Sequence, residues 1–369
     1  MKNIFVSGAT GFLGGAVIAN LLASQSTNNL LLLVRADTAA EGLQRVKENL
    51  RTLDVASAAL EKLTDADILI GDFTNVAAFS DDSRLDTITH VINCAAITSF
   101  GKNPLIWPVN VDGTFEFARR MAEVASLKRF LHVGTAMACG DSQQSPVTES
   151  WNVAPADEHL VPYTASKAAI EQRLHEELPD FPLVVARPSI VVGHTQLGCK
   201  PSSSIFWVFR MGQLLQQFTC SLDEKIDVIP VDYCADALVK LLLKDELAYD
   251  LYHISAGSGS SCTFEDIEIA LADGLGQAPF GDNYRQVKEE DIPQLAREFE
   301  ARLGPCNRRL VMRALRLYAG FADLNYVFGN GRLLSEGVEA SPLFTSYAGL
   351  CAQSTRHLSI QQQMQCDFK

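Results

Sequence analysis

Positive charge is scarce in this chain of 369 residues, which carries 31 Lys and Arg against 44 Asp and Glu. Its formal net charge at pH 7 is -13. Nucleic-acid binding depends on Lys and Arg side chains that neutralise phosphates, so this balance argues against a nucleic-acid partner. Hydrophobic residues make up 47% of the chain and charged residues 20%, a composition typical of globular proteins.

Long apolar runs, a secretory signal and paired cysteines are also missing. Residues 1–3 lead directly into the apolar residues 4–6, without the basic and long apolar regions of a signal peptide. There is no uncharged apolar stretch of about 18 residues, the length that spans a membrane. The nine cysteines form no Cys-x-x-Cys pair, which favours reduced thiols over a disulfide framework or a zinc site. We therefore expect a cytoplasmic protein without a metal centre.

Short apolar runs, each followed by a helical pattern, recur through the first half of the chain. The runs are residues 4–7, 30–34, 67–70, 90–94, 129–133 and 183–186. Such alternation is typical of a parallel sheet that is covered by helices on both faces. The sequence therefore predicts an α/β fold with a doubly wound, Rossmann-type parallel sheet.

The second half of the chain is mostly helical in pattern. A helix is expected near 205–218, and the runs 226–231 and 252–255 are expected to return to the sheet. From Thr263 onward the periodicity is helical, with strand alternation only near 324–328. The predicted organisation is a Rossmann domain over 1–195 with return segments at about 226–260, and a smaller, mostly helical cap over 196–225 and 261–369.

A glycine-rich turn follows the first predicted strand. Gly8, Gly11 and Gly14 have the spacing Gly-x-x-Gly-x-x-Gly and precede a helical pattern. Glycines in such a turn let the backbone approach a pyrophosphate, while the helix N-terminus offers free N–H groups to it. A turn that serves only packing is the alternative. The residues of the turn that we assign to a dinucleotide are Gly8, Thr10, Gly11, Phe12, Leu13 and Gly14.

Arg35 ends the second predicted strand, 21 residues after Gly14. An NAD enzyme usually has a carboxylate here for the ribose 2′-hydroxyl, whereas a guanidinium suits the 2′-phosphate of NADPH. Arg45 on the following helix adds a second positive charge. Asp37 is a carboxylate that suits NAD, and a solvated surface arginine is the other alternative. The arginines therefore favour NADPH as the cofactor.

Two further strand ends carry residues at the edge where a dinucleotide binds. Asp72 and Phe73 follow the third predicted strand, and Cys94, Ala95 and Ala96 end the fourth. In doubly wound sheets the adenine ring and the middle of the cofactor lie at this carboxyl edge. Ordinary strand-end packing would also explain either group.

Tyr163 and Lys167 stand four residues apart at the start of a predicted helix, so they share one face. A tyrosine phenol has a reference pKa near 10, about three units above neutral pH. A neighbouring ammonium favours the phenolate, so Lys167 is expected to lower the pKa of Tyr163 and make it a usable general acid. Thr135 ends another predicted strand at the same edge, and its hydroxyl would share a carbonyl oxygen with Tyr163. A surface pair is the alternative.

Together these residues resemble the extended short-chain dehydrogenase/reductase superfamily over roughly residues 1–260. Within it the chain resembles the branch of thioester reductases and fatty acyl-CoA reductases, which has the male-sterility type of NAD-binding domain. The segments that carry this second likeness are 33–36, 71–73, 110–114, 187–191 and 229–232. The resemblance implies the fold, a Thr-Tyr-Lys catalytic centre, NADPH and an acyl thioester substrate.

The resemblance also implies roles for individual residues. The glycines would hold the pyrophosphate, and Arg35 and Arg45 would hold the 2′-phosphate. Asp72 and Phe73 would contact the adenine, and Lys167 would also contact the nicotinamide ribose. Further implied cofactor-binding residues are Asn110, Pro188, Ser189 and Ile190. This chain departs from the branch at Gly134, where a serine is common, at Met137, where an aromatic residue is frequent, and at Phe73, where leucine is usual.

The favoured function is NADPH-dependent reduction of an acyl thioester to an aldehyde, with further reduction to an alcohol left open. A carbonyl reductase that acts on a ketone, aldehyde, hydroxysteroid or sugar nucleotide would use the same turn and the same Tyr163 and Lys167. A non-catalytic NADP-binding protein is a third reading, against which the joint presence of Thr135, Tyr163 and Lys167 argues. The acyl chain, its carrier and the oligomeric state stay open.

A basic amphipathic helix is predicted over residues 307–321. It carries four arginines against an apolar face, and these are Arg308, Arg309, Arg313 and Arg316. Such a helix suits an acidic acyl carrier protein, the phosphates of coenzyme A or peripheral contact with a membrane surface. A cap helix with a solvated basic face is the alternative.

Overall fold

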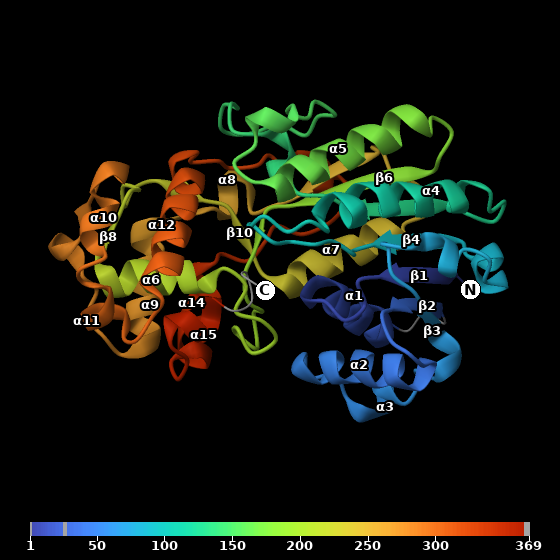
Figure 1. Cartoon of the computed structure of the whole chain (residues 1–369), viewed down its shortest axis with the longest axis horizontal. Coiled ribbons are helices and arrows are strands. Elements are labelled where there is room, and N and C mark those ends of the chain that lie inside the picture. The colour runs from blue at the N-terminus through green and yellow to red at the C-terminus, as the bar shows by residue number, and fades with distance from the viewer. Residues whose placement is uncertain (1, 25–27, 365–369) are drawn as a thin grey trace.

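The centre of the protein is a seven-stranded parallel sheet. The structure is a computed structural model, and it describes residues 2–24 and 28–364. The strand order is β11-β6-β5-β4-β1-β2-β3 (Figure 1). The strands are β1 (Asn3–Ser7), β2 (Asn29–Val34), β3 (Ile68–Ile70), β4 (His90–Asn93), β5 (Arg129–Val133), β6 (Leu183–Pro188) and β11 (Leu251–Ile254). Because β2 and β4 lie on opposite sides of β1, the winding direction changes there, which is where doubly wound sheets bind their ligands.

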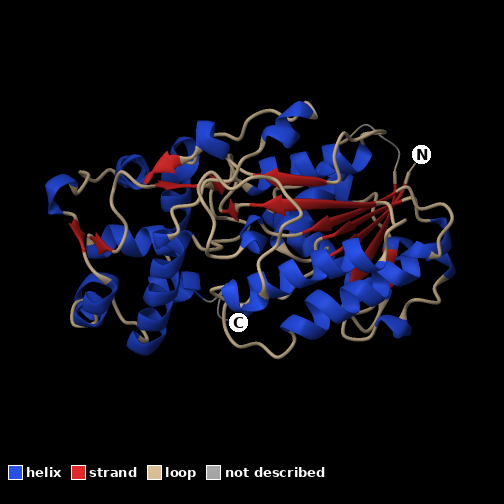
Figure 2. Cartoon of the chain, turned by 90° about the horizontal axis from the view of Figure 1, so that it is seen from above, coloured by secondary structure: helices blue, strands red, loops and turns tan. Residues whose placement is uncertain are grey.

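Helices cover both faces of this sheet (Figure 2). They are α1 (Phe12–Ala23), α2 (Ala39–Thr52), α4 (Thr114–Ala122), α5 (Pro162–Glu177) and α7 (Val231–Leu243). Along β1, Ile4 and Val6 pack in a core with α1, α2 and α7, whereas Phe5 packs in a second core with α4 and α5. All three side chains are fully buried. Burial on both faces explains why the strands read as unbroken apolar runs.

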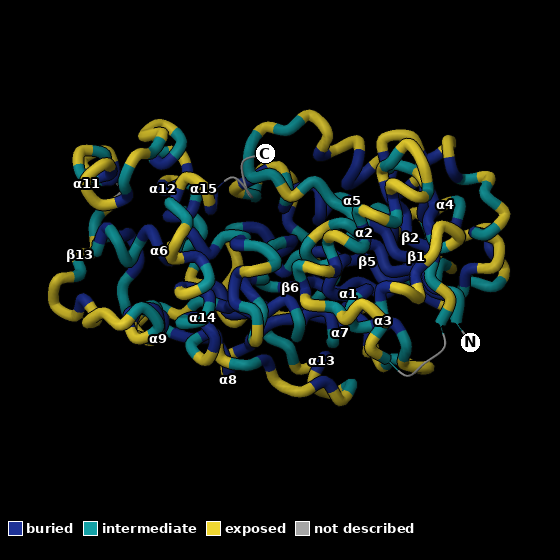
Figure 3. Tube along the Cα trace, turned by 90° about the horizontal axis from the view of Figure 1, so that it is seen from below, coloured by how far each residue is buried: buried dark blue, intermediate teal, exposed yellow. Residues whose placement is uncertain are grey.

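The cap lies beyond one end of the sheet, on the left in Figure 1. Its longer helices are α6 (Phe206–Leu215), α9 (Phe264–Leu275), α12 (Arg308–Asp323) and α14 (Thr345–Thr355). The short helices of the chain are α3 (Ser57–Leu60), α8 (Gly257–Ser260), α10 (Ile292–Leu295), α11 (Phe299–Leu303), α13 (Gly331–Ser335) and α15 (Ile360–Met364). The cap has its own buried clusters, one between α6 and α12 and one between α6, α9 and α14 (Figure 3).

The predicted fold class is confirmed. The six apolar runs of the first half form β1 to β6, and the run 252–255 forms β11. The helix expected near 205–218 is α6, and the basic helix expected over 307–321 is α12, which Asn307 caps through its side chain. The division of the chain into two domains stays a prediction.

The expectation that residues 226–231 rejoin the large sheet is wrong. The run is split into β9 (Lys225–Ile226), which pairs with β12 (Cys262–Thr263), and β10 (Val228–Ile229), which pairs with β7 (Ile190–Val191). There is a physical reason, since β11 already occupies the open edge of β6. The remaining two-residue strands are β8 (Gln217–Phe218) and β13 (Arg285–Gln286), which pair with each other. Residues 324–328 contribute a single bridge, from Phe328 to Val147.

The cysteines within the described part of the chain are all free, and most are buried. Cys366 lies outside the described residues. Among residues 2–24 and 28–364, no helix has the length and apolar character needed to cross a membrane. The same residues contain no group of three or more His, Cys, Asp or Glu side chains arranged to hold a metal ion.

Candidate functional site

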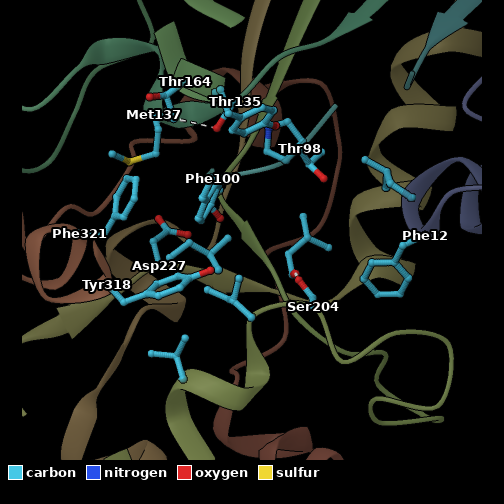
Figure 4. A pocket seen from close by; sticks show the side chains of 18 of the residues that line it. Phe12, Thr98, Phe100, Thr135, Met137, Thr164, Ser204, Asp227, Tyr318 and Phe321 are labelled. Atoms are coloured by element: carbon cyan, nitrogen blue, oxygen red, sulfur yellow. Dashed lines mark hydrogen bonds between the residues drawn. The ribbon is translucent and has the colours of Figure 1, made fainter. Parts of the chain in front are cut away.

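A cavity of about 690 Å³ lies between the carboxyl edge of the sheet and the cap (Figure 4). The structure brings most of the sequence-predicted site residues to its wall. Those that line it are Gly8, Thr10, Gly11, Phe12, Leu13, Gly14, Arg35, Asp72, Phe73, Cys94, Ala95, Ala96, Thr135, Tyr163, Lys167, Pro188, Ser189 and Ile190. Two predicted residues, Arg45 and Asn110, do not line it.

The glycine turn is tightly packed against the end of β4. Gly8 has φ +71°, and a Cβ there would lie 2.9 Å from the backbone nitrogen of Ala95. A Cβ on Gly14 would overlap with the Gly8 carbonyl oxygen. α1 begins after Gly11, and no side chain caps its first N–H groups. Free N–H groups beside a turn that excludes side chains form a cradle that fits a pyrophosphate.

Arg35 lines the cavity with a side chain that is 65% exposed, and its Nε lies 3.5 Å from Asp72 Oδ2. Arg45 donates a hydrogen bond to the backbone carbonyl of Arg35, so it lies behind Arg35 rather than in the cavity. The Asp37 backbone N–H donates to the Glu41 carboxylate, and Asp37 is not part of the cavity wall. Of these charged groups, Arg35 is therefore the one placed to meet a cofactor phosphate.

Asn110 is buried behind the cavity and holds the chain that follows Ala96. Its Oδ1 accepts the Ile97 N–H at 2.7 Å, and its Nδ2 donates to the Ile97 carbonyl at 3.1 Å and to Ser166 Oγ at 3.0 Å. Asn110 thus ties the loop after β4 to the helix that carries Tyr163. Asn110 therefore positions these two segments, and the cofactor contact implied by the resemblance stays a prediction.

α5 delivers Tyr163 and Lys167 to the cavity from its first two turns. Pro162 opens the helix at a position where its missing N–H costs no hydrogen bond. Lys167 is 3% exposed, and its Nζ donates to the carbonyl oxygen of Val133 at 2.7 Å. Burial lowers the pKa of Lys167 to about 8, although the nearby Glu171 carboxylate opposes the shift. The hydrogen bond from Lys167 to Val133 connects α5 to the end of β5.

The pKa of Tyr163 differs from the expectation. Burial raises it to about 12, and the negative charge of Glu171 adds to the rise. The expectation that Lys167 lowers this pKa is wrong for this structure, because burial of the phenol dominates and the Lys167 ammonium is bonded to Val133. A phenol with a raised pKa holds its proton at neutral pH, which suits a hydrogen-bond donor to a carbonyl oxygen.

Thr135 follows the end of β5 and lines the same cavity. Its hydroxyl oxygen accepts the N–H of Met137 at 3.3 Å, drawn as a dashed line in Figure 4. That bond uses an oxygen lone pair, so the hydroxyl hydrogen stays available to a ligand. Thr135 and Tyr163 therefore present two hydroxyl donors to one space.

Glu171 and Arg187 form an ion pair that sequence reasoning missed. Arg187 Nε lies 2.8 Å from Glu171 Oε2, its Nη2 lies 2.7 Å from the same oxygen, and both side chains are almost fully buried. Burial raises the pKa of Glu171, and the Arg187 charge opposes that shift. A Cβ at Gly134 would overlap with Glu171 Oε1. The carboxylate thus fills the space beside Gly134, which explains why no serine side chain stands there.

Phe100 connects Tyr163 to the cap, a second feature that the sequence did not predict. Its ring centroid lies 6.0 Å from that of Tyr163, 5.7 Å from Tyr318 and 5.6 Å from Phe321. The last two residues belong to α12, and Figure 4 shows Phe100 between the Thr135 side of the cavity and Tyr318. The cavity therefore continues from the catalytic residues into the cap.

Asp227 is a buried carboxylate in the wall of the cavity. It accepts the N–H groups of Ala256 at 2.7 Å, Gly257 at 3.3 Å and Phe328 at 3.0 Å. Burial raises its pKa, whereas these backbone hydrogen bonds lower it. Asp227 joins three distant chain segments, so it fixes the shape of the cavity beside the predicted nicotinamide position.

A profile of the NAD-binding family described as "Male sterility protein" matches residues 6–238. The chain belongs to this family. The match includes the glycine turn and the Tyr163–Lys167 pair, and it confirms the predicted resemblance and a nicotinamide dinucleotide as the class of cofactor.

Curated relatives and solved structures agree with the family. Fatty acyl-CoA reductase wat of Drosophila melanogaster is 24% identical over 282 residues, which are 64% of this chain and 53% of that protein. Aldehyde reductase lnaA of Aspergillus flavus is 25% identical over 341 residues, 86% of this chain and 31% of that protein. The chain thus spans about a third to a half of these relatives.

Among solved structures, the terminal R domain from the myxalamid PKS-NRPS biosynthetic pathway has a TM-score of 0.75 at 20% identity, covering 97% of this chain and 91% of that one. The reductase domain of a non-ribosomal peptide synthetase from Mycobacterium tuberculosis has a TM-score of 0.67 at 21% identity, covering 97% and 92%. These similarities show that the extended short-chain dehydrogenase/reductase fold is shared.

Proposed function

We propose that this protein reduces an acyl thioester to an aldehyde with NADPH. The observation that carries the proposal is the single cavity that joins the glycine turn, the Thr135, Tyr163 and Lys167 centre, and an apolar region of the cap. Relatives named as fatty acyl-CoA reductases and solved reductase domains of peptide synthetases support the choice of a thioester over other carbonyl compounds.

In this mechanism the Tyr163 and Thr135 hydroxyls donate to the carbonyl oxygen of the thioester, where negative charge develops. Bound NADPH would supply the hydride. Lys167, held by Val133, places a positive charge near the same oxygen. Breaking the C–S bond releases a thiolate, which takes one proton, so one hydride and one proton convert the thioester into an aldehyde and a free thiol. Phe100 packs against Tyr163 on the side of the cap, where it would limit the access of water to this step.

The direct test follows NADPH oxidation by its absorbance with a series of acyl-CoA thioesters, and with the matching aldehydes and ketones. We expect thioester-dependent oxidation with release of one free thiol per aldehyde formed. Oxidation with aldehydes or ketones alone would contradict the proposal and would support a carbonyl reductase. Cofactor binding without turnover of any compound would support a non-catalytic NADP-binding protein.

Arg35 is proposed to select NADPH over NADH. Replacing Arg35 by alanine should raise the KM for NADPH by about 10-fold or more, since a charge-assisted hydrogen bond contributes about 1.5–3 kcal/mol. The KM for NADH should change by less than about twofold on the same scale. Steady-state kinetics with both cofactors checks this. Arg51→Ala, an exposed arginine on α2 outside the cavity, is the control, and an equal loss with both cofactors would contradict the role.

We further propose that an acidic acyl carrier protein docks on the outer face of α12. Arg308, Arg309, Arg313 and Arg316 border a groove there together with Met312. Arg308 pairs with Glu300 at 2.8 Å, and the other three arginines have no ion pair among the described residues. The inner face of α12 lines the cavity through Tyr318 and Phe321. A thiolation-reductase di-domain from an archaeal peptide synthetase has the same fold, at a TM-score of 0.68 and 17% identity.

Charge reversal tests this docking surface. The double variant Arg309→Glu, Arg313→Glu should raise the KM for a carrier-bound acyl group by about 10-fold or more at low salt, with a smaller effect at high salt because ions screen exposed charges. The matched control reverses two exposed arginines elsewhere, Arg51 and Arg119. An unchanged apparent affinity for every acyl donor would overturn the docking proposal.

A further inference from the structure

Gly212 lies inside the helix α6, at a position where no neighbouring atom would exclude a larger residue. A glycine inside a helix costs about 1 kcal/mol relative to alanine. Two other helical glycines have close neighbours that exclude a side chain: a Cβ on Gly113 would overlap with the Phe73 carbonyl, and one on Gly274 with Gly349. A Cβ on Gly212 would meet no atom within 4 Å. The missing side chain therefore leaves open space.

That open space belongs to the cavity. Val208, Phe209, Gly212 and Gln213 line it, and their spacing places them on one face of α6. The opposite face is closed, because it carries the buried side chains of Trp207, Met211 and Leu215, which pack in the cap cluster with α12. Gly212 is thus the one point on the inner face of α6 where the wall has no side chain.

Much of the cavity wall that α9 and its neighbours contribute is apolar, although Gln213 and Glu268 also line the cavity. α9 contributes Phe264, Ile267 and Leu271, and the chain around it contributes Phe218 and Phe280. The carboxylate of Glu268, on the same face of α9, accepts the N–H of Phe280 at 3.1 Å. An alkyl or aryl group would exchange water for apolar contacts here, whereas a sugar would leave its hydroxyls with few partners.

The space is continuous with the catalytic end of the cavity. Thr135 and Tyr163 line the same cavity as Val208 and Gly212, and Tyr318 and Phe321 of α12 line it as well. An acyl group whose carbonyl lies at Tyr163 and Thr135 therefore has its chain directed between α6, α9 and α12.

We propose that Gly212 is a specificity-determining residue. Its missing side chain keeps open an apolar recess in the cap, which receives the distal part of the acyl chain. The size of this recess sets the longest acyl chain that fits. This inference rests on the proposed thioester reduction. It identifies the substrate class of that site as acyl groups with an extended apolar chain.

The test replaces Gly212 by leucine, whose Cβ would meet no atom within 4 Å and whose larger side chain should occupy the recess. Each buried CH₂ group contributes about 0.8 kcal/mol, so loss of three buried methylenes should lower kcat/KM for hexadecanoyl-CoA by about 50-fold. For butanoyl-CoA, whose chain is much shorter, the fall should be under about threefold by the same scale. Gly212→Ala should lie between leucine and the wild type.

Gly331→Leu is the matched control. Gly331 is exposed, lies outside the cavity and likewise has no atom within 4 Å of an added Cβ. Its profile across chain lengths should match that of the wild type. Thermal unfolding of both variants checks that each remains folded.

Two outcomes overturn the proposal. One is a Gly212→Leu profile that parallels the wild type at every chain length, and the other is an equal loss for butanoyl-CoA and hexadecanoyl-CoA. Calorimetric titration with dodecanoic and hexadecanoic acid gives a readout that does not require turnover. If the wild type reduces no thioester but binds hexadecanoic acid more tightly than Gly212→Leu does, the proposed recess is supported and the proposed reaction is contradicted. If neither acid binds either protein and no thioester turns over, both fail.

Discussion

Replacing Tyr163 by phenylalanine is expected to lower kcat for thioester reduction by about 10²–10⁴-fold, the usual contribution of a positioned general acid. The substitution removes only the hydroxyl, whose raised pKa of about 12 keeps it protonated as a donor. The phenyl ring retains its packing against Phe100, 6.0 Å away. The dissociation constant for NADPH, measured by fluorescence titration, should therefore change by less than about threefold.

Tyr233→Phe makes the same chemical change outside the cavity, where the hydroxyl donates to the Glu339 carbonyl at 3.1 Å. It should turn over thioesters at the wild-type rate. Retained activity in Tyr163→Phe would remove Tyr163 from the mechanism. Loss of NADPH affinity together with activity would instead assign Tyr163 a structural role in the cofactor site.

The large sheet was predictable because its strands are buried on both faces. Ile4 and Val6 face one core and Phe5 faces the other, so every residue of this part of β1 is apolar. A continuous apolar run of this kind is typical of a parallel strand with both faces covered. The run 226–231 looks similar in sequence, yet it forms two short strands elsewhere. What separates it is Asp227, whose carboxylate binds backbone groups of residues 256, 257 and 328. Such distant contacts leave no local periodic signal.

The Tyr163–Lys167 pair was predictable from spacing, but its electrostatics were not. Tyr163 and Lys167 share a helix face at any degree of burial, so the pair is visible in the sequence. The sign of the Tyr163 pKa shift depends on burial of the phenol and on the negative charge of Glu171, and only the fold shows that burial. Arg45 is a similar case, since its bond to the Arg35 carbonyl turns it away from the cavity wall.

The Glu171–Arg187 pair left one signal in the sequence, a carboxylate four residues after Lys167 on the same helix face. Nothing local distinguishes it from the exposed pair of Arg173 and Glu177, which is an ordinary i,i+4 pair at 2.9 Å. Only the fold shows that Arg187 reaches Glu171 from β6 and that water reaches neither side chain.

Replacing Glu171 by alanine is expected to lower the free energy of unfolding by about 3–5 kcal/mol, because it leaves the Arg187 guanidinium buried without its counter-charge. Urea denaturation measures this change. Glu177→Ala removes the exposed member of the pair with Arg173 on the same helix and should cost only about 0.5 kcal/mol. Equal losses of unfolding free energy in Glu171→Ala and Glu177→Ala would contradict the assignment of Glu171 as the buried counter-charge of Arg187.

A substitution at Gly134 tests whether the Glu171 carboxylate occupies the space beside it. A serine at position 134 collides with Glu171 Oε1, so Gly134→Ser should destabilise the wild type. In a Glu171→Ala background the space is free, so the same serine should cost at least about 1 kcal/mol less, a coupling of the size seen between contacting residues. A double-mutant cycle in urea measures that coupling. Additive losses of the free energy of unfolding would mean that the carboxylate does not occupy the space beside Gly134. The buried ion pair would then not contact the loop that carries Thr135.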